Sequence, residues 1–317
     1  MARWTLGIDL GGTKVGIGLV DESGKIGRQE KIKTSAAGPD AVIADIVSAS
    51  KKLIGEDQIL AAGVGMAGQI ADRSGLVHFA PNLGWKDFPL GTKLGNALDV
   101  PVSVINDVRA AAWGEWLHGA GVGCPDLLCL FFGTGIGAGV VSGGRMLTGS
   151  NNAAGEVGHM TIALHGALCG CGNRGCFETL AGGWGIARRA REVIAYDAVR
   201  GQRLLELAGG NSDAITAREV FIAYREKVPV AVKVIEEFKE ALIMGISSLV
   251  NIFNPSKVIL GGGIIQGNLD LVEVVRQGVP KQALKVSVAQ LEIVPALLAG
   301  EAGIVGAASF AREYGKK

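Results

Sequence analysis

One histidine and three cysteines have the spacing of metal ligands. His159 precedes Cys169 and Cys171, and Cys176 closes a C-x-C-x4-C run whose glycines let the chain curl around an ion. One imidazole and three thiolates form the ligand set of a closed, tetrahedral zinc site. In a reducing compartment, cysteines crowded in this way favour metal over free thiols or a disulfide. We therefore predict a structural zinc ion with no open coordination position.

Two carboxylates flank this cluster. Glu156 stands three residues before His159, and Glu178 stands two residues after Cys176. A bound zinc ion would fix the loops that carry both side chains. Carboxylates at fixed positions are good acceptors for the hydroxyl groups of a sugar. Without further context, the two residues are interpreted more simply as surface glutamates.

A glycine turn follows an acidic residue near the start of the chain. The segment consists of Asp9, Leu10, Gly11, Gly12, Thr13 and Lys14. Glycines let backbone N–H groups point at an anion, and the threonine adds a hydroxyl donor. Asp9 is placed to hold Mg²⁺ directly or through water. Lys14 either adds charge to this site or is a solvated turn residue, and the spacing is not that of a Walker A loop.

A second glycine-rich turn occurs later in the chain. Residues 132–139 contain Gly133, Thr134 and Gly135, and they repeat the strand–turn–strand pattern around residues 12–18. Alone, this turn is typical of a tight hairpin, and the Rossmann pattern G-x-G-x-x-G is not matched. The repeat suggests two related halves, which we favour over chance because the flanking strands also match. Together the two turns predict a clamp for nucleotide phosphates.

A polar pair ends another apolar run. Asn106 and Asp107 follow residues 102–105, and a helix is expected to start near Val108. Asp107 could simply cap that helix. It could equally accept the proton of an attacking hydroxyl group, as a kinase requires, with Asn106 bonding a neighbouring hydroxyl. From the residues alone, both interpretations stay open.

The elements that position these residues alternate between strands and helices. Short apolar runs that end in polar or glycine residues predict an α/β fold with its sites at the strand ends. Strands are predicted at residues 6–8, 15–20, 59–64, 102–105, 127–132, 136–141 and 257–260. Helices are predicted at residues 39–54, 230–253 and 302–314, near residue 108 and after a capping box that begins at Thr216.

The bulk properties exclude several classes of protein. The chain has 317 residues, 48% of them hydrophobic, which is enough for two domains. With 31 basic and 30 acidic residues, no charge excess favours nucleic acid or a membrane surface. We see no signal peptide and no apolar run long enough to span a bilayer, so we expect a cytoplasmic location. Cys124 and Cys129 are expected in the core.

The chain resembles the ROK family of sugar kinases and repressors over nearly its whole length. The matching motifs are IDLGGTK (8–14), PNLGW (81–85), IND (105–107), FGTGIGAG (132–139), GEVGHM (155–160), CGCGNRGCFE (169–178) and LGGGI (260–264). The resemblance implies a two-domain, actin-like (ribonuclease-H-like) ATPase fold with the active site in the cleft between the domains. Residues 1–108 and the helix at 302–317 would form the small α/β domain, and residues 109–301 the large one with the zinc site.

The resemblance also implies a role for each matching residue. Asp107 would be the general base on the 6-hydroxyl group of the sugar. The other sugar contacts would come from Gly68, Asn82, Asn106, Glu156, His159 and Glu178. His159 would bind zinc through one ring nitrogen and could present the other to the sugar. Gly262 and Gly263 would lie near the nucleotide. The family's repressors carry an N-terminal helix-turn-helix, for which this chain has no room before its first loop.

Two departures from the family pattern matter. The common G-x-P-G turn is here Gly65-Met-Ala-Gly68, in which Ala67 loosens the turn but leaves Gly68 available. The family's E-N-D-A-N is here I-N-D-V-R, which places Arg109 near the candidate base. If Arg109 points at Asp107, it lowers the pKa of that carboxyl. We expect instead that it points outward as a solvated helix residue.

These features predict an ATP- and Mg²⁺-dependent hexokinase. Glucose is the first expectation, because the NLGW segment resembles that of glucokinases; the cysteine cluster favours ATP over polyphosphate as the donor. The resemblance suggests a dimer or tetramer. Kinases for mannose, fructose, allose, N-acetylglucosamine or N-acetylmannosamine are alternatives, as is a sugar-sensing protein without catalysis. A zinc-dependent structural module would explain the cysteines but not the duplicated glycine turns.

Overall fold

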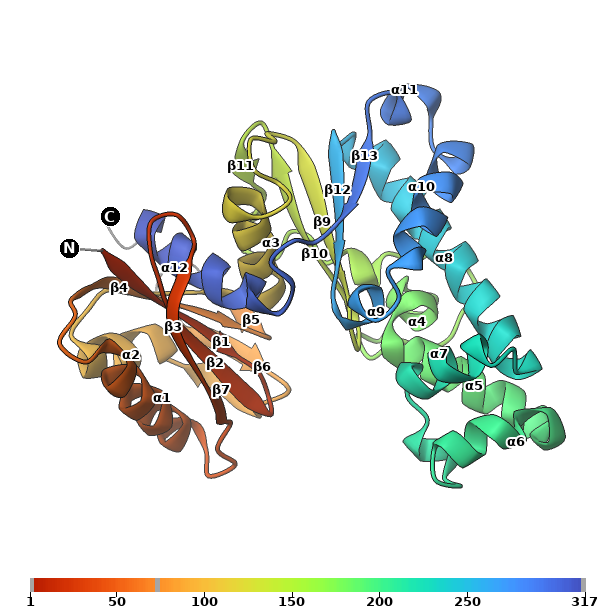
Figure 1. The fold of residues 1–317 in the computed structure, drawn as a ribbon, viewed down its shortest axis with the longest axis horizontal. Helices are drawn as coiled ribbons and strands as arrows, with labels where there is room; N and C mark the ends of the chain where they lie inside the picture. Colours follow the sequence, from red (N-terminus) through yellow and green to blue (C-terminus); the bar gives the residue numbers. More distant parts are fainter. Residues whose placement is uncertain (1–2, 72–74, 315–317) are drawn as a thin grey trace. The chain divides into compact units, whose positions relative to one another are not determined.

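The computed structural model describes residues 3–71 and 75–314 (Figure 1). The chain forms two compact units that are each assembled from separate segments. The first unit comprises Met1–Cys129, Gly139–Gly155 and Ala296–Lys317, and the second comprises Leu130–Ala138 and Glu156–Pro295. The domain division that we predicted after residue 108 stays a prediction. Residues 315–317 of the predicted C-terminal helix lie outside the described residues.

A five-stranded sheet forms the centre of the first unit. Its strands are β1 (Trp4–Leu10), β2 (Lys14–Val20), β3 (Ile26–Lys33), β4 (Ile59–Met66) and β8 (Val102–Asn106), in the order β3-β2-β1-β4-β8. Strands β1, β4 and β8 are parallel, whereas β1, β2 and β3 form antiparallel hairpins. Because parallel strands end at one edge of a sheet, the ends of β1 and β8 lie at the same edge.

Helices cover both faces of this sheet (Figure 1). On one face, α1 (Pro39–Ile54) and α2 (Leu90–Leu98) share a core with the apolar side chains of the strands. On the other, α3 (Asp107–His118) and α12 (Ala302–Tyr314) pack against each other and against β4. Both faces of the central strands are therefore buried, which explains their nearly continuous apolar sequences.

The face under α12 is lined by glycine. Side chains alternate between the faces of a strand, and the alternation in β1 and β4 places large residues toward α1 and glycines toward α12. A Cβ atom added at Gly7 would overlap the carbonyl oxygen of Ile304, and one added at Gly63 would overlap that of Ala307. The helix therefore lies closer to the sheet than any other residue type at these positions would allow.

A small antiparallel sheet follows β4. Its strands are β5 (Gln69–Ile70), β6 (Val77–Ala80) and β7 (Trp85–Phe88), in the order β5-β6-β7. Gly68 precedes it, and a Cβ atom there would lie 2.7 Å from the carbonyl oxygen of Phe79. This close approach requires glycine. The turn between β6 and β7 carries Asn82.

The second five-stranded sheet repeats the topology of the first. Its strands are β9 (Leu127–Phe132), β10 (Ile136–Ser142), β11 (Arg145–Met146), β12 (Lys257–Gly261) and β13 (Glu292–Pro295), in the order β11-β10-β9-β12-β13. Counted along the chain within each sheet, both orders are third, second, first, fourth and fifth strand. The β1–β2 and β9–β10 turns, which carry the two glycine motifs, are therefore equivalent. This agrees with the predicted duplication.

Helices make up most of the second unit. They are α4 (Glu178–Ala181), α5 (Gly183–Tyr196), α6 (Ala198–Leu207), α7 (Ala217–Arg225), α8 (Pro229–Phe253), α9 (Gly263–Gln266), α10 (Asp270–Gln282) and α11 (Lys285–Val288). The capping box predicted at the start of α7 is formed by Thr216 and Glu219. Helix α8 begins with proline and ends at Asn254, whose φ of 45° closes the helix before Pro255.

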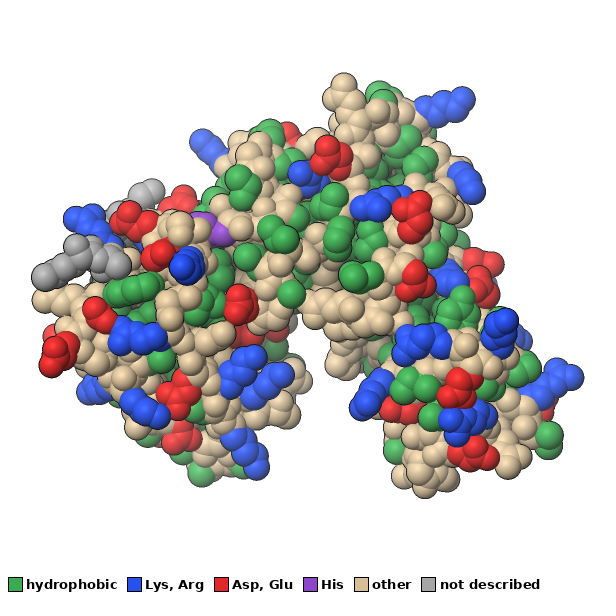
Figure 2. Space-filling model, viewed as in Figure 1, with side chains coloured by type: hydrophobic (Ala, Val, Ile, Leu, Met, Phe, Trp, Pro, Cys, Tyr) green, Lys and Arg blue, Asp and Glu red, His purple; other side chains and the backbone are tan. Residues whose placement is uncertain are grey.

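The prediction of an α/β fold is confirmed. Among the described residues, the helices are all too short or too polar to cross a membrane. Basic and acidic side chains are interspersed over the face drawn in Figure 2, in keeping with a net charge of +1. Cys129 is buried in β9, as expected, whereas Cys124 is only half-buried.

Candidate functional site

Two carboxylates lie at the edge of the first sheet where β1 and β8 end. Burial, followed by the negative charge of Asp107, raises the pKa of Asp9 to about 6, against the opposing effect of Lys14 and Lys31. Burial also raises the pKa of Asp107, and a hydrogen bond of 2.9 Å from the backbone N–H of Val108 opposes this rise. Two acids that share a poorly solvated site are suited to two roles: they can hold a cation, and one of them can accept a proton.

Asn106, and not Asp107, is the cap of α3. The Oδ1 atom of Asn106 accepts hydrogen bonds from the backbone N–H groups of Val108 at 3.1 Å and Arg109 at 3.2 Å. Asp107 is the first residue inside the helix. The capping role that we left open for Asp107 is thus filled by its neighbour.

The first glycine turn is short and exposed. The backbone N–H of Gly11 donates to the carbonyl oxygen of Lys14 at 3.0 Å, which closes the turn. Gly12, Thr13 and Lys14 face solvent. A Cβ atom at Gly12 would lie 3.2 Å from the carbonyl oxygen of Asn82, so this turn and the turn between β6 and β7 are in contact. The structure therefore brings together two of the predicted site segments.

Two glycines that we did not predict as site residues lie close to the carboxylates, and Gly303 lets the first turn of α12 approach Asp9. A Cβ atom at Gly303, in the first turn of α12, would lie 2.9 Å from Cγ of Asp9. A Cβ atom at Gly65, in β4, would lie 3.6 Å from Cα of Asp107. From the sequence we predicted residues 302–314 only as a helix, with no role for Gly303 in the site.

The expectation that Arg109 is a solvated helix residue is wrong. Its side chain is only 5% exposed, and Nη1 donates a hydrogen bond of 2.7 Å to Oδ1 of Asn152. Asn152 in turn donates from Nδ2 to the carbonyl oxygen of Ile70 at 3.2 Å. Burial and hydrogen bonds within α3, rather than Arg109, determine the pKa of Asp107. This position of α3 faces the segment after β11, which covers it.

In the second unit, the four predicted zinc ligands lie together. The ligand atoms of His159, Cys169, Cys171 and Cys176 are all within 4.8 Å of one another. The Sγ atoms of Cys171 and Cys176 are 3.7 Å apart, and Sγ of Cys169 is 3.6 Å from Nδ1 of His159. Tetrahedral zinc with bonds of about 2.3 Å places its sulfur ligands about 3.8 Å apart. The donor set and its spacing therefore fit zinc.

The two carboxylates beside this cluster differ in their surroundings. Oε1 of Glu178 accepts a hydrogen bond of 3.1 Å from Sγ of Cys169 and lies 3.7 Å from Nδ1 of His159. The side chain of Glu178 is 14% exposed. Glu156 is exposed and precedes the short 3-10 helix Val157–His159. Glu178 is thus held against the cluster, in contrast to a surface glutamate.

The second glycine turn contacts both Glu178 and the start of α5. A Cβ atom at Gly135 would lie 2.7 Å from Oε2 of Glu178. The backbone N–H groups of Gly183 and Trp184 donate to the carbonyl oxygens of Gly133 at 2.9 Å and Thr134 at 3.0 Å. The turn is therefore fixed between α5 and the carboxylate, with its backbone at the edge of a cavity.

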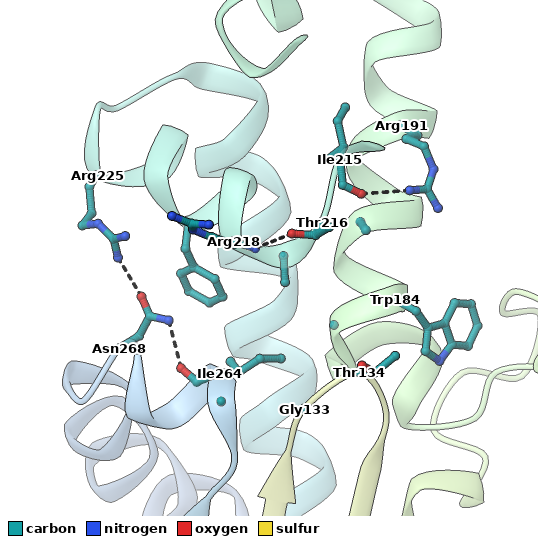
Figure 3. A pocket seen from close by; sticks show the side chains of 16 residues that line it. Gly133, Thr134, Trp184, Arg191, Ile215, Thr216, Arg218, Arg225, Ile264 and Asn268 are labelled. Atoms are coloured by element: carbon teal, nitrogen blue, oxygen red, sulfur yellow. Dashed lines mark hydrogen bonds between the residues drawn. The ribbon is translucent and has the colours of Figure 1, made fainter. Parts of the chain in front are cut away.

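A cavity of about 680 Å³ opens beside this turn (Figure 3). Three of the residues predicted to contact the nucleotide line this cavity: Gly133, Thr134 and Gly263. Two others, Gly135 and Gly262, are not among its lining residues. Gly262 instead has a φ of 87° and packs against the backbone of Phe132. A cavity of this volume is large enough for a nucleotide.

The remaining walls come from residues that sequence reasoning missed. Helices α5, α7 and the segment after α9 supply Trp184, Arg191, Thr216, Arg218, Phe221, Arg225 and Asn268. Arg225 donates to Oδ1 of Asn268 at 2.9 Å, and Asn268 donates to the carbonyl oxygen of Ile264 at 2.9 Å, as Figure 3 shows. These bonds tie α7 to α9 across the cavity. No short motif marks these residues, because three separate parts of the chain contribute them.

Comparison with known proteins relates the whole chain to sugar kinases. Residues 5–314 match the ROK family. The glucokinase of Streptomyces coelicolor is 35% identical over 310 residues, 98% of each chain. The N-acetylmannosamine kinase of Escherichia coli O157:H7 is 33% identical over 313 residues, 97% of this chain and 98% of that one. A crystal structure of a ROK family glucokinase from Streptomyces griseus, in complex with glucose and AMPPNP, has a TM-score of 0.83 and 34% identity, covering 98% of this chain and 99% of that one.

Proposed function

Because this chain belongs to the ROK family, we propose that it is an ATP-dependent kinase that phosphorylates the 6-hydroxyl group of a hexose, with glucose as the first substrate. The glucokinase relatives align with it from end to end. The related structure from Streptomyces griseus holds glucose and an ATP analogue. The chain itself retains the carboxylates and both glycine turns that such a reaction needs.

Asp107 is the general base in this proposal. It accepts the proton of the 6-hydroxyl group while that oxygen attacks the γ-phosphorus, and the bond between the γ-phosphorus and the bridging oxygen of ADP breaks. Burial raises the pKa of Asp107, which makes it a better proton acceptor than a solvated carboxylate. Asn82 and Asn106 bind other hydroxyl groups of the sugar, and Gly68 leaves room beside them.

Asp9 and the exposed turn at residues 11–14 are assigned to the phosphates and their Mg²⁺ ion. Each of the two acids at this edge is poorly solvated, and the charge of Asp107 disfavours ionisation of Asp9. A divalent cation would offset both effects, so the pair suits one. Asp9 would hold Mg²⁺, which when bound would supply positive charge beside the phosphates. The backbone N–H groups of the turn and the hydroxyl of Thr13 donate to phosphate oxygens.

The second unit binds the rest of the nucleotide and part of the sugar. Gly133, Thr134 and Gly263 present backbone to the nucleotide in the 680 Å³ cavity. His159, Glu156 and Glu178 accept or donate hydrogen bonds to sugar hydroxyls. Zinc, held by the four clustered ligands, would fix the loop on which these groups are carried.

The observation that carries the proposal is the pair of half-buried acids, Asp9 and Asp107, beside a glycine turn. It is tested by measuring ADP release with ATP, Mg²⁺ and a panel of hexoses and N-acetylhexosamines. We expect strong turnover with glucose. Asp107→Asn should lower kcat by roughly 10²–10⁴-fold while glucose still binds. Asp45→Asn, an exposed acid on α1, serves as the control and should behave as wild type.

Two outcomes separate the alternatives. Turnover only with another sugar keeps the chemistry and changes the substrate; N-acetylmannosamine is the first candidate, because a kinase for it is 33% identical to this chain. Sugar binding without turnover by the wild-type protein would instead support a sensing protein. Turnover by Asp107→Asn within a few fold of wild type would rule out its role as base.

Further features complete the proposal. We assign the protein to the cytoplasm, where ATP is available and where phosphorylating a hexose opens its use in glycolysis. We propose a homodimer or homotetramer, with small-molecule substrates and no nucleic-acid or membrane partner. Sedimentation of the purified protein measures its oligomeric state directly.

A further inference from the structure

A second cavity, of about 600 Å³, lies entirely within the first unit. It is bounded by β8, α3, the end of α12 and residues 144–152, which include β11. None of the residues assigned above to catalysis, sugar, nucleotide or zinc lines it. Its volume is in the range of pockets that bind small molecules.

Aromatic rings form one wall of this cavity. Trp113 packs edge-on against Trp116, with ring centroids 5.3 Å apart, and against Phe310 at 5.4 Å. Phe310 is 4.7 Å from Tyr314. Trp116 is fixed by a hydrogen bond of 3.0 Å from its indole nitrogen to the carbonyl oxygen of Cys124. This rigid wall suits the flat, apolar face of a sugar ring.

Charged and hydroxyl groups line the rest. Arg109 lines the cavity, 5% exposed and held in place by its hydrogen bond to Asn152, and Glu313 contributes one carboxylate to the lining. Arg145 is exposed at the rim, with the hydroxyl groups of Thr148 and Ser150 nearby in the lining. Two guanidinium groups match the oxygens of a phosphate. The hydroxyl groups match those of a sugar.

We propose that this cavity is a second ligand site, distinct from the active site, which binds a phosphorylated monosaccharide. The phosphate contacts the two arginines and the sugar ring lies against the aromatic wall. This inference goes beyond the proposed function, and its test rests on that function in so far as glucose and an ATP analogue fill the active site.

Binding at this site regulates the first turn of α3. The backbone N–H of Arg109 donates to Oδ1 of Asn106, the residue that caps the helix, and Asp107 lies between the two. A phosphate that draws on the guanidinium group of Arg109 therefore acts on the same turn that carries Asp107. We expect the ligand to change kcat rather than the KM for the hexose.

The test is calorimetric titration of the full-length protein with glucose 6-phosphate. Saturating glucose and a non-hydrolysable ATP analogue occupy the active site throughout, so the product cannot bind there. We expect one remaining binding event per chain. Arg109→Asn, which introduces the family's own residue, should weaken it by at least about tenfold. Arg145→Ala at the exposed rim should weaken it without affecting the fold, and Arg200→Asn on α6 should leave it unchanged.

Four results would overturn the proposal. The first is no binding once the active site is filled. The second is equal affinity in wild type and both cavity variants. The third is equal affinity for inorganic phosphate and glucose 6-phosphate, which would reduce the cavity to a free phosphate site. A shift in oligomeric state of the two variants without any loss of ligand binding would likewise assign the cavity to a subunit interface.

Discussion

At the residue scale, the chemistry depends on two acids that the fold holds in poorly solvated positions. Gly303 lets the first turn of α12 approach Asp9, and Gly65 in β4 leaves room for the first turn of α3, because an added Cβ atom would lie 3.0 Å from Cβ of Ala110. The result is a pair of carboxylates that water stabilises poorly. Ionising both carboxylates is unfavourable in the absence of a cation and favourable when a cation is bound. This fits a site that binds Mg²⁺ and phosphate.

The protein without nucleotide should therefore be more stable when Asp9 is replaced by Asn. A carboxyl whose pKa rises from 3.8 to about 6 on folding costs stability as the pH increases through that interval. Asp9→Asn should raise the free energy of unfolding at pH 7 by on the order of 2 kcal/mol and flatten its pH dependence below pH 6. Urea denaturation between pH 5 and 7.5, with Asp45→Asn as control, measures this. Equal stability of Asp9→Asn and wild type at pH 7 would contradict it, whereas its kinase activity should be lost.

At the element scale, the glycine-lined sheet face decides how α12 packs. We expect Gly63→Ala to destabilise the protein by about 1–3 kcal/mol, because the added methyl group overlaps the backbone of Ala307. Gly300→Ala is the matched control, since nothing lies within 4 Å of its added Cβ. Urea titration compares the two. If both substitutions have the same effect, the close packing of α12 is not the reason for the glycine.

The capping box of α7 makes a second prediction at this scale. Thr216→Ala removes the hydrogen bond of 3.2 Å that its Oγ1 accepts from the backbone N–H of Arg218. The substitution should lower the free energy of unfolding by about 0.5–2 kcal/mol. It should also raise the KM for ATP with little change in kcat, because α7 forms one wall of the proposed nucleotide cavity. Thr92→Ala, on the exposed face of α2, should leave that KM unchanged. Steady-state kinetics at varied ATP concentration decide between these outcomes.

The elements show how far the sequence was informative. The helices at residues 39–54 and 302–314 and the strand at 127–132 have the predicted bounds, because each has a clear apolar pattern. Strand β3 and the small sheet were missed, because their side chains are mostly exposed and leave no apolar run. The buried position of Arg109 was also missed, because it depends on a contact with Asn152, distant in sequence. The glycine turns and the cysteine cluster were found because their spacing is local.

At the scale of the whole molecule, two units of the same sheet topology carry different chemistry. The first unit holds the paired acids, and the second holds the 680 Å³ cavity and the cluster of one histidine and three cysteines. In our proposal the two glycine turns, at equivalent places in the two sheets, therefore have different tasks. The ROK family and the actin-like fold implied by the sequence are confirmed by the match over residues 5–314 and by the related structures.

Removal of zinc should disturb the sugar site and the second unit together. Purified protein should contain one zinc ion per chain, and chelation should lower its melting temperature and weaken glucose binding, because zinc would fix the loops of the ligand cluster beside which Glu178 lies. Cys171→Ser should reproduce both effects, and Cys124→Ser, outside the cluster, should reproduce neither. Metal analysis that finds no zinc in active protein would contradict the assignment.

The central claim, transfer of a phosphoryl group from ATP to the 6-hydroxyl group of a hexose, is tested most directly by ³¹P NMR of the reaction with ATP, Mg²⁺ and glucose. We predict that the resonance of the γ-phosphorus disappears as that of glucose 6-phosphate grows, in equal amount with ADP. Formation of ADP and inorganic phosphate without a sugar phosphate, or no consumption of ATP with any hexose of the panel, would contradict the claim.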